Sequence, residues 1–175
     1  MSIKTKIRSI PDFPKKGITF RDVSTLFNDE RSMKEIIFLL SDKLKTKEFD
    51  AIAGIEARGF VVGAALAFHL GKAFIMIRKP GKLPSKVISK KFDLEYGSDS
   101  LEIHLDAVSE NQRILIVDDL LATGGTALAA CSLVEELGGV VEALAFIVDL
   151  PELGGSKRIK SFGYDLINLI GFEGG

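Results

Sequence analysis

Two adjacent carboxylates and the short segment that follows them form the most informative group of residues in this sequence. Asp118 and Asp119 can accept hydrogen bonds from a sugar diol or hold a hydrated magnesium ion. Residues 122–126 (ATGGT) offer the opposite chemistry, because glycines, two hydroxyls and the N–H groups of a starting helix favour an anion. A ligand with both a cis-diol and a phosphate suits both halves, and a ribose 5-phosphate is the simplest ligand of this kind.

Each half of this segment also occurs in proteins that do not bind a sugar phosphate. Paired aspartates occur at strand ends in receiver domains and phosphatases, and a TGGT run can be an ordinary turn from a strand to a helix. A nucleoside triphosphate loop is excluded, because the segment lacks the Gly-Lys-Ser/Thr ending that reaches the terminal phosphates. A dinucleotide-binding fold is disfavoured, because no G-x-G-x-x-G opens a helix here. The contiguity of the two halves favours a sugar phosphate.

Alternating strands and helices are expected to position these residues. Residues 114–117 (ILIV) are consecutive aliphatics, typical of a strand that is buried on both faces and ends before the carboxylates. Hydrophobic spacing and terminal glycines predict further buried strands at residues 50–55, 73–77 and 140–148, and helices at 32–45, 59–70 and 127–137. This succession predicts an α/β fold with a mostly parallel sheet flanked by helices, which binds ligands at the carboxyl ends of its strands.

A long segment, residues 79–108, interrupts the alternation, and positive charge is concentrated at its start. Between residues 78 and 91 there are six cations and no acid: Arg78, Lys79, Lys82, Lys86, Lys90 and Lys91. One interpretation is a solvated, mobile loop, and the other is a loop that binds pyrophosphate beside the sugar phosphate. Pro80, Gly81 and Pro84 favour a shaped loop that opens and closes.

The later part of the same segment has the pattern of a strand. Leu101, Ile103 and Leu105 alternate with polar residues, as in a half-exposed antiparallel strand on which His104 faces outward. The other histidine, His69, ends an apolar helix, and no metal-ligand spacing links the two. Both histidines are therefore interpreted as structural or surface residues.

Composition limits the remaining possibilities. The chain has 175 residues, enough for one domain, and its net charge of −1 argues against a nucleic-acid or membrane-surface binder. Its single cysteine, Cys131, is expected to fill space in the core, where it has no second thiol for an internal disulfide. No secretory signal is recognisable, and the longest apolar run, residues 60–68, is shorter than the roughly 20 residues of a membrane span. A cytoplasmic protein is expected.

The sequence also resembles a known enzyme family. Residues 114–126 (ILIVDDLLATGGT) are similar to the phosphoribosyl pyrophosphate signature of the type I phosphoribosyltransferases. Four other segments resemble the adenine-specific members: residues 17–22 (GITFRD), 57–60 (ARGF), 78–84 (RKPGKLP) and 94–97 (LEYG). The resemblance implies one domain over residues 1–175 with a Rossmann-like sheet. About the first 30 residues and the segment after residue 149 would form a hood over the base, and residues 79–108 a flexible catalytic loop and antiparallel hairpin.

An activity is implied by the same resemblance. It is the transfer of the 5-phosphoribosyl group from phosphoribosyl pyrophosphate to adenine, which gives AMP and pyrophosphate in purine salvage. The implied cofactor is magnesium, Mg²⁺, held mainly by the substrate and through water by Asp118 and Asp119. A cytoplasmic homodimer is implied, with no nucleic-acid or membrane partner.

The resemblance also implies roles for individual residues. The 5-phosphate would be held by Ala122, Thr123, Gly124, Gly125 and Thr126, and the ribose hydroxyls by the two aspartates. Pyrophosphate would be bound by Arg58, Arg78, Lys79 and Lys82, with the region of Arg78 reaching a neighbouring subunit's site. A cis peptide bond is implied between Glu56 and Ala57.

The base is the part of the ligand for which most alternatives stay open. The resemblance implies a slot between Phe20 and Leu150, beside Arg21, although Phe20 is also explained as a core aromatic. Glu95 would steady the base or relay its proton, and alternatively it only positions the closing loop with Tyr96. With Arg58, which would bind the leaving group, Glu95 and Tyr96 are the implied catalytic residues. Residue chemistry alone leaves guanine, hypoxanthine and xanthine open as bases. The rival interpretations are an oxopurine transferase and a regulator that senses phosphoribosyl pyrophosphate.

Overall fold

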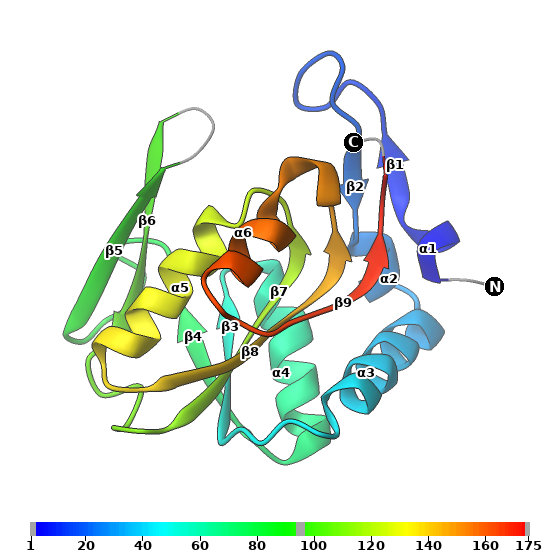
Figure 1. Cartoon of the computed structure of the whole chain (residues 1–175). Coiled ribbons are helices and arrows are strands. Elements are labelled where there is room, and N and C mark those ends of the chain that lie inside the picture. The colour runs from blue at the N-terminus through cyan, green and yellow to red at the C-terminus, as the bar shows by residue number, and fades with distance from the viewer. Residues whose placement is uncertain (1–2, 94–96, 174–175) are drawn as a thin grey trace.

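A parallel sheet of five strands forms the centre of the molecule in the computed structural model, which describes residues 3–93 and 97–173 (Figure 1). The strands lie in the order β4 (Ala73–Ile77), β3 (Ala51–Ile55), β7 (Arg113–Leu121), β8 (Val140–Asp149) and β9 (Leu166–Gly171). Every neighbouring pair in this sheet is parallel. The predicted α/β fold with a parallel sheet is confirmed.

Helices cover both faces of this sheet (Figure 1). On one face lie α3 (Glu30–Leu44) and α4 (Arg58–Leu70), and on the other α5 (Gly125–Glu136) and α6 (Gly155–Ser161). The central strand β7 contacts both layers, since Leu115 and Val117 belong to the core of α3 and α4, while Ile114 and Ile116 belong to the core of α5. All four side chains are fully buried, which explains the unbroken run of aliphatic residues.

Local sequence signals set the ends of the helices. α3 begins after Asp29, whose carboxylate accepts a hydrogen bond from the backbone N–H of Ser32. α4 ends at Gly71 and α5 is followed by Gly138, and both glycines have a positive φ, of 63° and 85°. The helices predicted at residues 32–45, 59–70 and 127–137 are confirmed, with ends that move by one or two residues.

Both edges of the sheet differ from the prediction. The pattern predicts four parallel strands, and the fifth is β9, whose side chains are only half-buried or exposed and whose apolar run is interrupted by Asn168. The strand predicted to be buried at residues 73–77 is β4, but Ala73 and Met76 are exposed in it. An edge strand has a neighbour on one side only, so its burial depends on the rest of the fold.

An antiparallel hairpin, β5 (Val87–Asp93) and β6 (Ser98–His104), leaves the sheet and rises beside α5 (Figure 1). Leu101 and Ile103 are fully buried, as the alternation predicts. Leu105 does not continue this pattern, because β6 ends before it and the residue lies exposed in a turn. His104 does not face solvent freely: it is half-buried, with its Nε2 enclosed.

A small hood, residues 3–27, lies at the carboxyl end of the sheet. It contains α1 (Ile3–Lys6), β1 (Arg8–Ile10), β2 (Phe20–Asp22) and α2 (Ser24–Phe27), and its two strands pair antiparallel. The hood and the hairpin rise at the same end of the molecule, on opposite sides (Figure 1). The chain after β9 reaches the hood, where the guanidinium carbon of Arg21 lies 4.4 Å from the ring centroid of Phe172. Within the described residues, no helix is long and apolar enough to span a membrane.

Candidate functional site

The two carboxylates lie within β7. The sequence pattern had placed them beyond the end of the strand, and that prediction is wrong. The pairing of β7 with β8 continues through Asp118 and ends only at Leu121, opposite Asp149. Backbone pairing with β8 extends β7 beyond its run of aliphatic residues. Asp119 is almost completely buried, with 3% of its surface exposed, and Asp118 is half-buried.

Burial and charge make this pair of carboxylates electrostatically unusual. Burial raises the pKa of Asp118 well above its ordinary value, and the neighbouring charge of Asp119 raises it further. Burial also raises the pKa of Asp119, but Arg58 opposes this effect. The Nε of Arg58 lies 2.6 Å from the Asp119 Oδ2, and the Asp119 N–H donates to the Asp118 Oδ1 at 2.8 Å. The carboxylates therefore favour a ligand that donates hydrogen bonds or carries positive charge.

The predicted phosphate-binding loop follows directly and turns into α5. Gly124 has a φ of 82°, in the left-handed region that favours glycine, and α5 begins at Gly125. The loop encloses a cavity of about 90 Å³, lined by Asp118, Leu120, Leu121, Ala122, Thr123, Gly124, Thr126, Ala127 and Phe146. The loop and the Asp118 carboxylate thus line the same cavity. This combination suits a sugar that carries both a phosphate and free hydroxyls.

A second cavity, of about 280 Å³, also borders the carboxylates. Its lining consists of Glu56, Ala57, Arg58, Asp118 and Asp119. The expected cis peptide bond between Glu56 and Ala57 is present. Because Asp118 lines both cavities, the predicted phosphate loop and Arg58 both lie close to the carboxylates.

Glycine at position 59 permits this arrangement. A Cβ on Gly59 would lie 2.8 Å from the Asp118 Oδ1 and 2.9 Å from the Val117 carbonyl oxygen. Any side chain would therefore push α4 away from β7. Gly59 brings Arg58, the first residue of α4, to the carboxylates.

The positively charged segment contacts the second cavity through Glu56. The Glu56 Oε2 lies 3.2 Å from the Arg78 Nε and accepts a hydrogen bond from the Lys79 backbone N–H at 2.8 Å. Arg78 also donates to the Lys82 carbonyl at 3.1 Å, while the Lys79 ammonium pairs with Asp99 of β6. Sequence reasoning missed Glu56 as an anchor, although its position just after a buried strand, at the same edge as Asp118, was the available signal.

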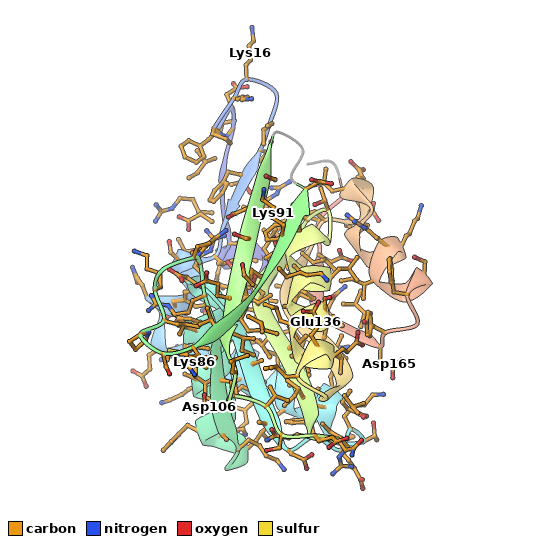
Figure 2. All side chains as sticks on the ribbon, turned by 90° about the vertical axis from the view of Figure 1, so that its left-hand side faces the viewer. Lys16, Lys86, Lys91, Asp106, Glu136 and Asp165 are labelled. Carbon is orange, nitrogen blue, oxygen red and sulfur yellow. The ribbon has the colours of Figure 1, made fainter. Side chains whose placement is uncertain are left out.

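The six cations do not form one cluster. Lys86 precedes β5 at the foot of the hairpin and Lys91 lies toward its tip, so the charges are spread along its length (Figure 2). Lys90 pairs with Glu136 of α5 at 2.7 Å. Arg78, Lys79 and Lys82 are thus the members of the set that stay near the second cavity.

The residues predicted for the base are only partly brought together. Phe20 is half-buried, with its ring centroid 5.3 Å from that of Phe13 and 5.8 Å from the guanidinium carbon of Arg58. Arg21 donates to the Ser9 hydroxyl at 2.5 Å, and Leu150 packs against the core of α3 and α4. The slot between Phe20 and Leu150 stays a prediction. Glu95 and Tyr96 lie outside the described residues.

Side chains that could bind a metal do not cluster within the described residues. No group of three or more His, Cys, Asp or Glu side chains within residues 3–93 and 97–173 is arranged to hold a metal ion. The lone thiol, Cys131, is fully buried in the core of α5, as predicted. Burial raises its pKa to about 12.

The fold and the site define a class of protein. A parallel α/β sheet carries the predicted phosphate loop and paired carboxylates at its carboxyl edge, and the family model of the phosphoribosyl transferase domain matches residues 22–172. The chain belongs to the phosphoribosyltransferase family, and the resemblance seen in the sequence is confirmed.

Individual relatives specify the branch of this family. The chain is 57% identical to the adenine phosphoribosyltransferase of Chlorobium phaeobacteroides and 55% identical to that of Chlorobium limicola, over 99% of each chain. The crystal structure of the adenine phosphoribosyltransferase from Thermoanaerobacter pseudethanolicus superimposes with a TM-score of 0.93 at 53% identity, over 97% of this chain and 98% of that one. Within the family, the chain groups with the adenine phosphoribosyltransferases, which are transferases.

Proposed function

We propose that this protein transfers the 5-phosphoribosyl group from phosphoribosyl pyrophosphate to adenine and releases AMP and pyrophosphate, in purine salvage. The observation that carries the proposal is the pair of cavities that share Asp118. One cavity has a loop for the phosphate that stays on the sugar, and the other has Arg58 for the pyrophosphate that leaves. A site that only bound a sugar phosphate would need the first cavity alone.

Structures of relatives support adenine as the base. The adenine phosphoribosyltransferase of Saccharomyces cerevisiae, 34% identical with a TM-score of 0.88 over 96% of each chain, was crystallised with D-2,5-dideoxy-2,5-imino-altritol 1,6-bisphosphate and adenine. The enzyme of Giardia lamblia, 32% identical with a TM-score of 0.91 over 98% of each chain, was crystallised with 9-deazaadenine. In this chain, Phe20 and Leu150 would stack on the base, and a backbone carbonyl near Arg21 would accept its amine. Oxopurines leave that carbonyl unpaired, which costs about 1–3 kcal/mol.

The residues divide the work of the displacement at the anomeric carbon. Positive charge develops on the sugar and negative charge on the leaving pyrophosphate. Asp118 and Asp119 accept the ribose hydroxyls and stabilise the positive sugar, while Arg58 exchanges its partner Asp119 for a pyrophosphate oxygen. Lys82, which is exposed beside Arg78, adds positive charge on the same side.

Two further roles complete the proposed mechanism. Glu95, with Tyr96 on the same segment, would take or steady the proton that adenine loses from its attacking nitrogen. Closure of the loop around Lys79 and Lys82 would exclude water, which otherwise hydrolyses the activated sugar.

The carboxylates fit a hydrated magnesium ion. Mg²⁺ keeps several waters and is usually bound through one or two carboxylates together with substrate phosphates. Asp118 and Asp119 meet this requirement, and the buried Asp119 Oδ2, which lies against Arg58, accepts no hydrogen bond from the described part of the chain. When bound, the ion neutralises charge on the pyrophosphate. Asp118 and Asp119 would hold it through its water shell.

A cytoplasmic homodimer is the proposed assembly. Val61, Ala64 and Phe68 form one exposed stripe of α4, and Phe68 has 91% of its surface exposed. Phe38 of α3, 60% exposed, packs edge-on against His69 next to this stripe. A continuous exposed apolar surface of two helices favours association with a second copy.

One assay tests the proposed function. The protein is incubated with phosphoribosyl pyrophosphate, magnesium and, separately, adenine, hypoxanthine, guanine or xanthine, and nucleotides are separated by chromatography. AMP from adenine, with little product from the oxopurines, is expected. Nucleotide formed mainly from an oxopurine would contradict the base assignment, and no product from any base would contradict the transferase activity.

A further inference from the structure

Asp149, a buried carboxylate at the end of β8, has no part in the proposed transfer but links several elements around it. It is 8% exposed. The hydroxyl of Ser156 in α6 lies 2.6 and 2.5 Å from its two oxygens, and the side-chain amide of Asn168 in β9 donates at 2.9 Å. A buried carboxylate needs such donors, so these contacts fix α6 and β9 relative to the end of β8.

The start of α6 in turn contacts the phosphate-binding loop. Gly155, immediately before Ser156, donates its backbone N–H to the Ala122 carbonyl at 3.0 Å. The approach is so close that a Cβ on Gly155 would lie 2.2 Å from the Ala122 oxygen and 3.0 Å from the Gly124 nitrogen. A Cβ on Gly124 would in turn lie 3.3 Å from Gly155. The loop and α6 therefore pack backbone to backbone, and a shift of α6 displaces the loop.

The contact with Gly155 also orients the loop. In a trans peptide the carbonyl and the following N–H point in opposite directions. The bond between Ala122 and Thr123 is trans, so tying the Ala122 carbonyl to Gly155 turns the Thr123 N–H away from α6. Ala122 and Thr123 both line the cavity assigned to the phosphate.

We propose that Asp149 and Ser156 are positioning residues for the 5-phosphate. They hold the start of α6, and Gly155 then keeps the loop peptide in the orientation that binds the anion. This inference rests on the proposed function, because it assigns the phosphate to this loop. Its consequence is selective: Ser156 acts through Gly155 on the loop assigned to the sugar phosphate, so loss of the Ser156 hydroxyl is expected to weaken the sugar phosphate and not the base.

Steady-state kinetics of a Ser156→Ala variant test the proposal. The substitution removes the hydroxyl, and the KM for phosphoribosyl pyrophosphate is expected to rise about tenfold, the order of one hydrogen bond to a charged group. The KM for adenine is expected to stay within about twofold. Ser156→Thr retains a hydroxyl and restores the affinity. The matched control is Ser161→Ala in the same helix, whose hydroxyl donates to the Arg158 carbonyl at 2.7 Å and which changes neither constant.

Direct binding separates this inference from the proposed function. Calorimetry with ribose 5-phosphate needs no turnover, so it reports on the loop even if the wild-type protein forms no AMP. Weaker ribose 5-phosphate binding in Ser156→Ala and Asp149→Asn, with binding unchanged in Ser161→Ala, supports the proposal. Unchanged affinity for ribose 5-phosphate in these variants overturns it. An equal loss of affinity for adenine also overturns it, as does a lower melting temperature without a selective loss of affinity for ribose 5-phosphate.

Discussion

Arg58 and Asp119 form an ion pair in the candidate site. Both residues line the second cavity, with 2.6 Å between the Arg58 Nε and the Asp119 Oδ2. In the proposed mechanism, substrate binding exchanges this contact for one between Asp119 and the sugar or its metal and another between Arg58 and pyrophosphate. The pair keeps a buried carboxylate compensated until a ligand replaces its partner.

Residue chemistry identified the half of the site that is continuous in sequence. Asp118, Asp119 and the loop at residues 122–126 stand side by side in the chain, so their chemistry is recognisable without a fold. The anchors of the basic segment are different, because Glu56 and Asp99 are distant in sequence from the charges that they pair with. Such partners become visible only when the strands are paired.

The raised pKa of Asp118 predicts that its ionised carboxylate destabilises the folded protein, although the proposed function needs this side chain for ligand binding. Its pKa in the folded protein is above the unfolded value of about 4, so the free energy of unfolding falls as pH rises from there through the folded pKa. Asp118→Asn removes this cost, and at pH 8 the melting temperature without substrate is expected to rise by a few degrees. Binding of phosphoribosyl pyrophosphate is expected to be lost.

The control for this prediction is Asp106→Asn, an exposed residue at the foot of the hairpin (Figure 2). It is expected to change neither the melting temperature nor binding. Thermal unfolding of both variants at pH 5 and pH 8 gives the comparison. A melting temperature of Asp118→Asn below that of the wild type at pH 8 contradicts the account.

At the scale of elements, sequence patterns predict the type and the ends of a helix or strand but not which elements pack or pair beside it. The helix ends at Asp29 and Gly71 follow from capping chemistry, and they were predictable within two residues. β7 continues past its aliphatic run because β8 pairs with it through Leu121. β9 escaped prediction because the edge of the sheet leaves its side chains half-exposed, without an apolar pattern.

The cap of α3 makes a testable contribution to acid stability. Hydrogen bonds from Lys6 and Ser32 lower the pKa of Asp29 to about 2. Because the folded pKa is below the unfolded one, the stabilisation is fully present above about pH 4 and is lost as pH falls toward 2. Asp29→Asn keeps a capping side chain without the charge. Its melting temperature is therefore expected to be lower than that of the wild type at pH 7, with a gap that narrows as pH falls from 4 to 3.

Asp42→Asn, near the other end of α3, is the matched control. Asp42 forms an exposed pair with Lys45 at 3.0 Å, which contributes little to stability. Thermal melts from pH 7 to pH 3 measure the gap for both variants. A difference in melting temperature between the wild type and Asp29→Asn that does not depend on pH would contradict the role of the Asp29 charge.

At the scale of the whole molecule, the proposed homodimer depends on the exposed apolar surface of α3 and α4. Phe68→Asp places a charge on the most exposed side chain of this surface. Because Phe68 is not part of the core, the substitution is not expected to destabilise the fold of the single chain. Sedimentation equilibrium is expected to give twice the 19.0 kDa of one chain for the wild type and a single chain for the variant. Phe162→Asp, at the end of α6 and 64% exposed, controls for the added charge.

A variant that still sediments as a dimer contradicts the assigned surface, and a monomeric wild type contradicts the homodimer. The sequence alone offered no such surface. The exposed stripe of α4 depends on which of its faces packs against β3 and β7, and the apolar helix at residues 59–70 does not distinguish its faces by composition.

The proposed function requires one site that holds the retained sugar phosphate and the leaving pyrophosphate in two separate halves. Calorimetry with ribose 5-phosphate and with magnesium pyrophosphate, on Thr126→Val and on Arg58→Ala, tests it most directly. Thr126→Val is expected to weaken ribose 5-phosphate about tenfold and leave pyrophosphate within about twofold, and Arg58→Ala is expected to do the reverse. Equal weakening of both ligands in both variants, or the opposite pattern, would contradict the division.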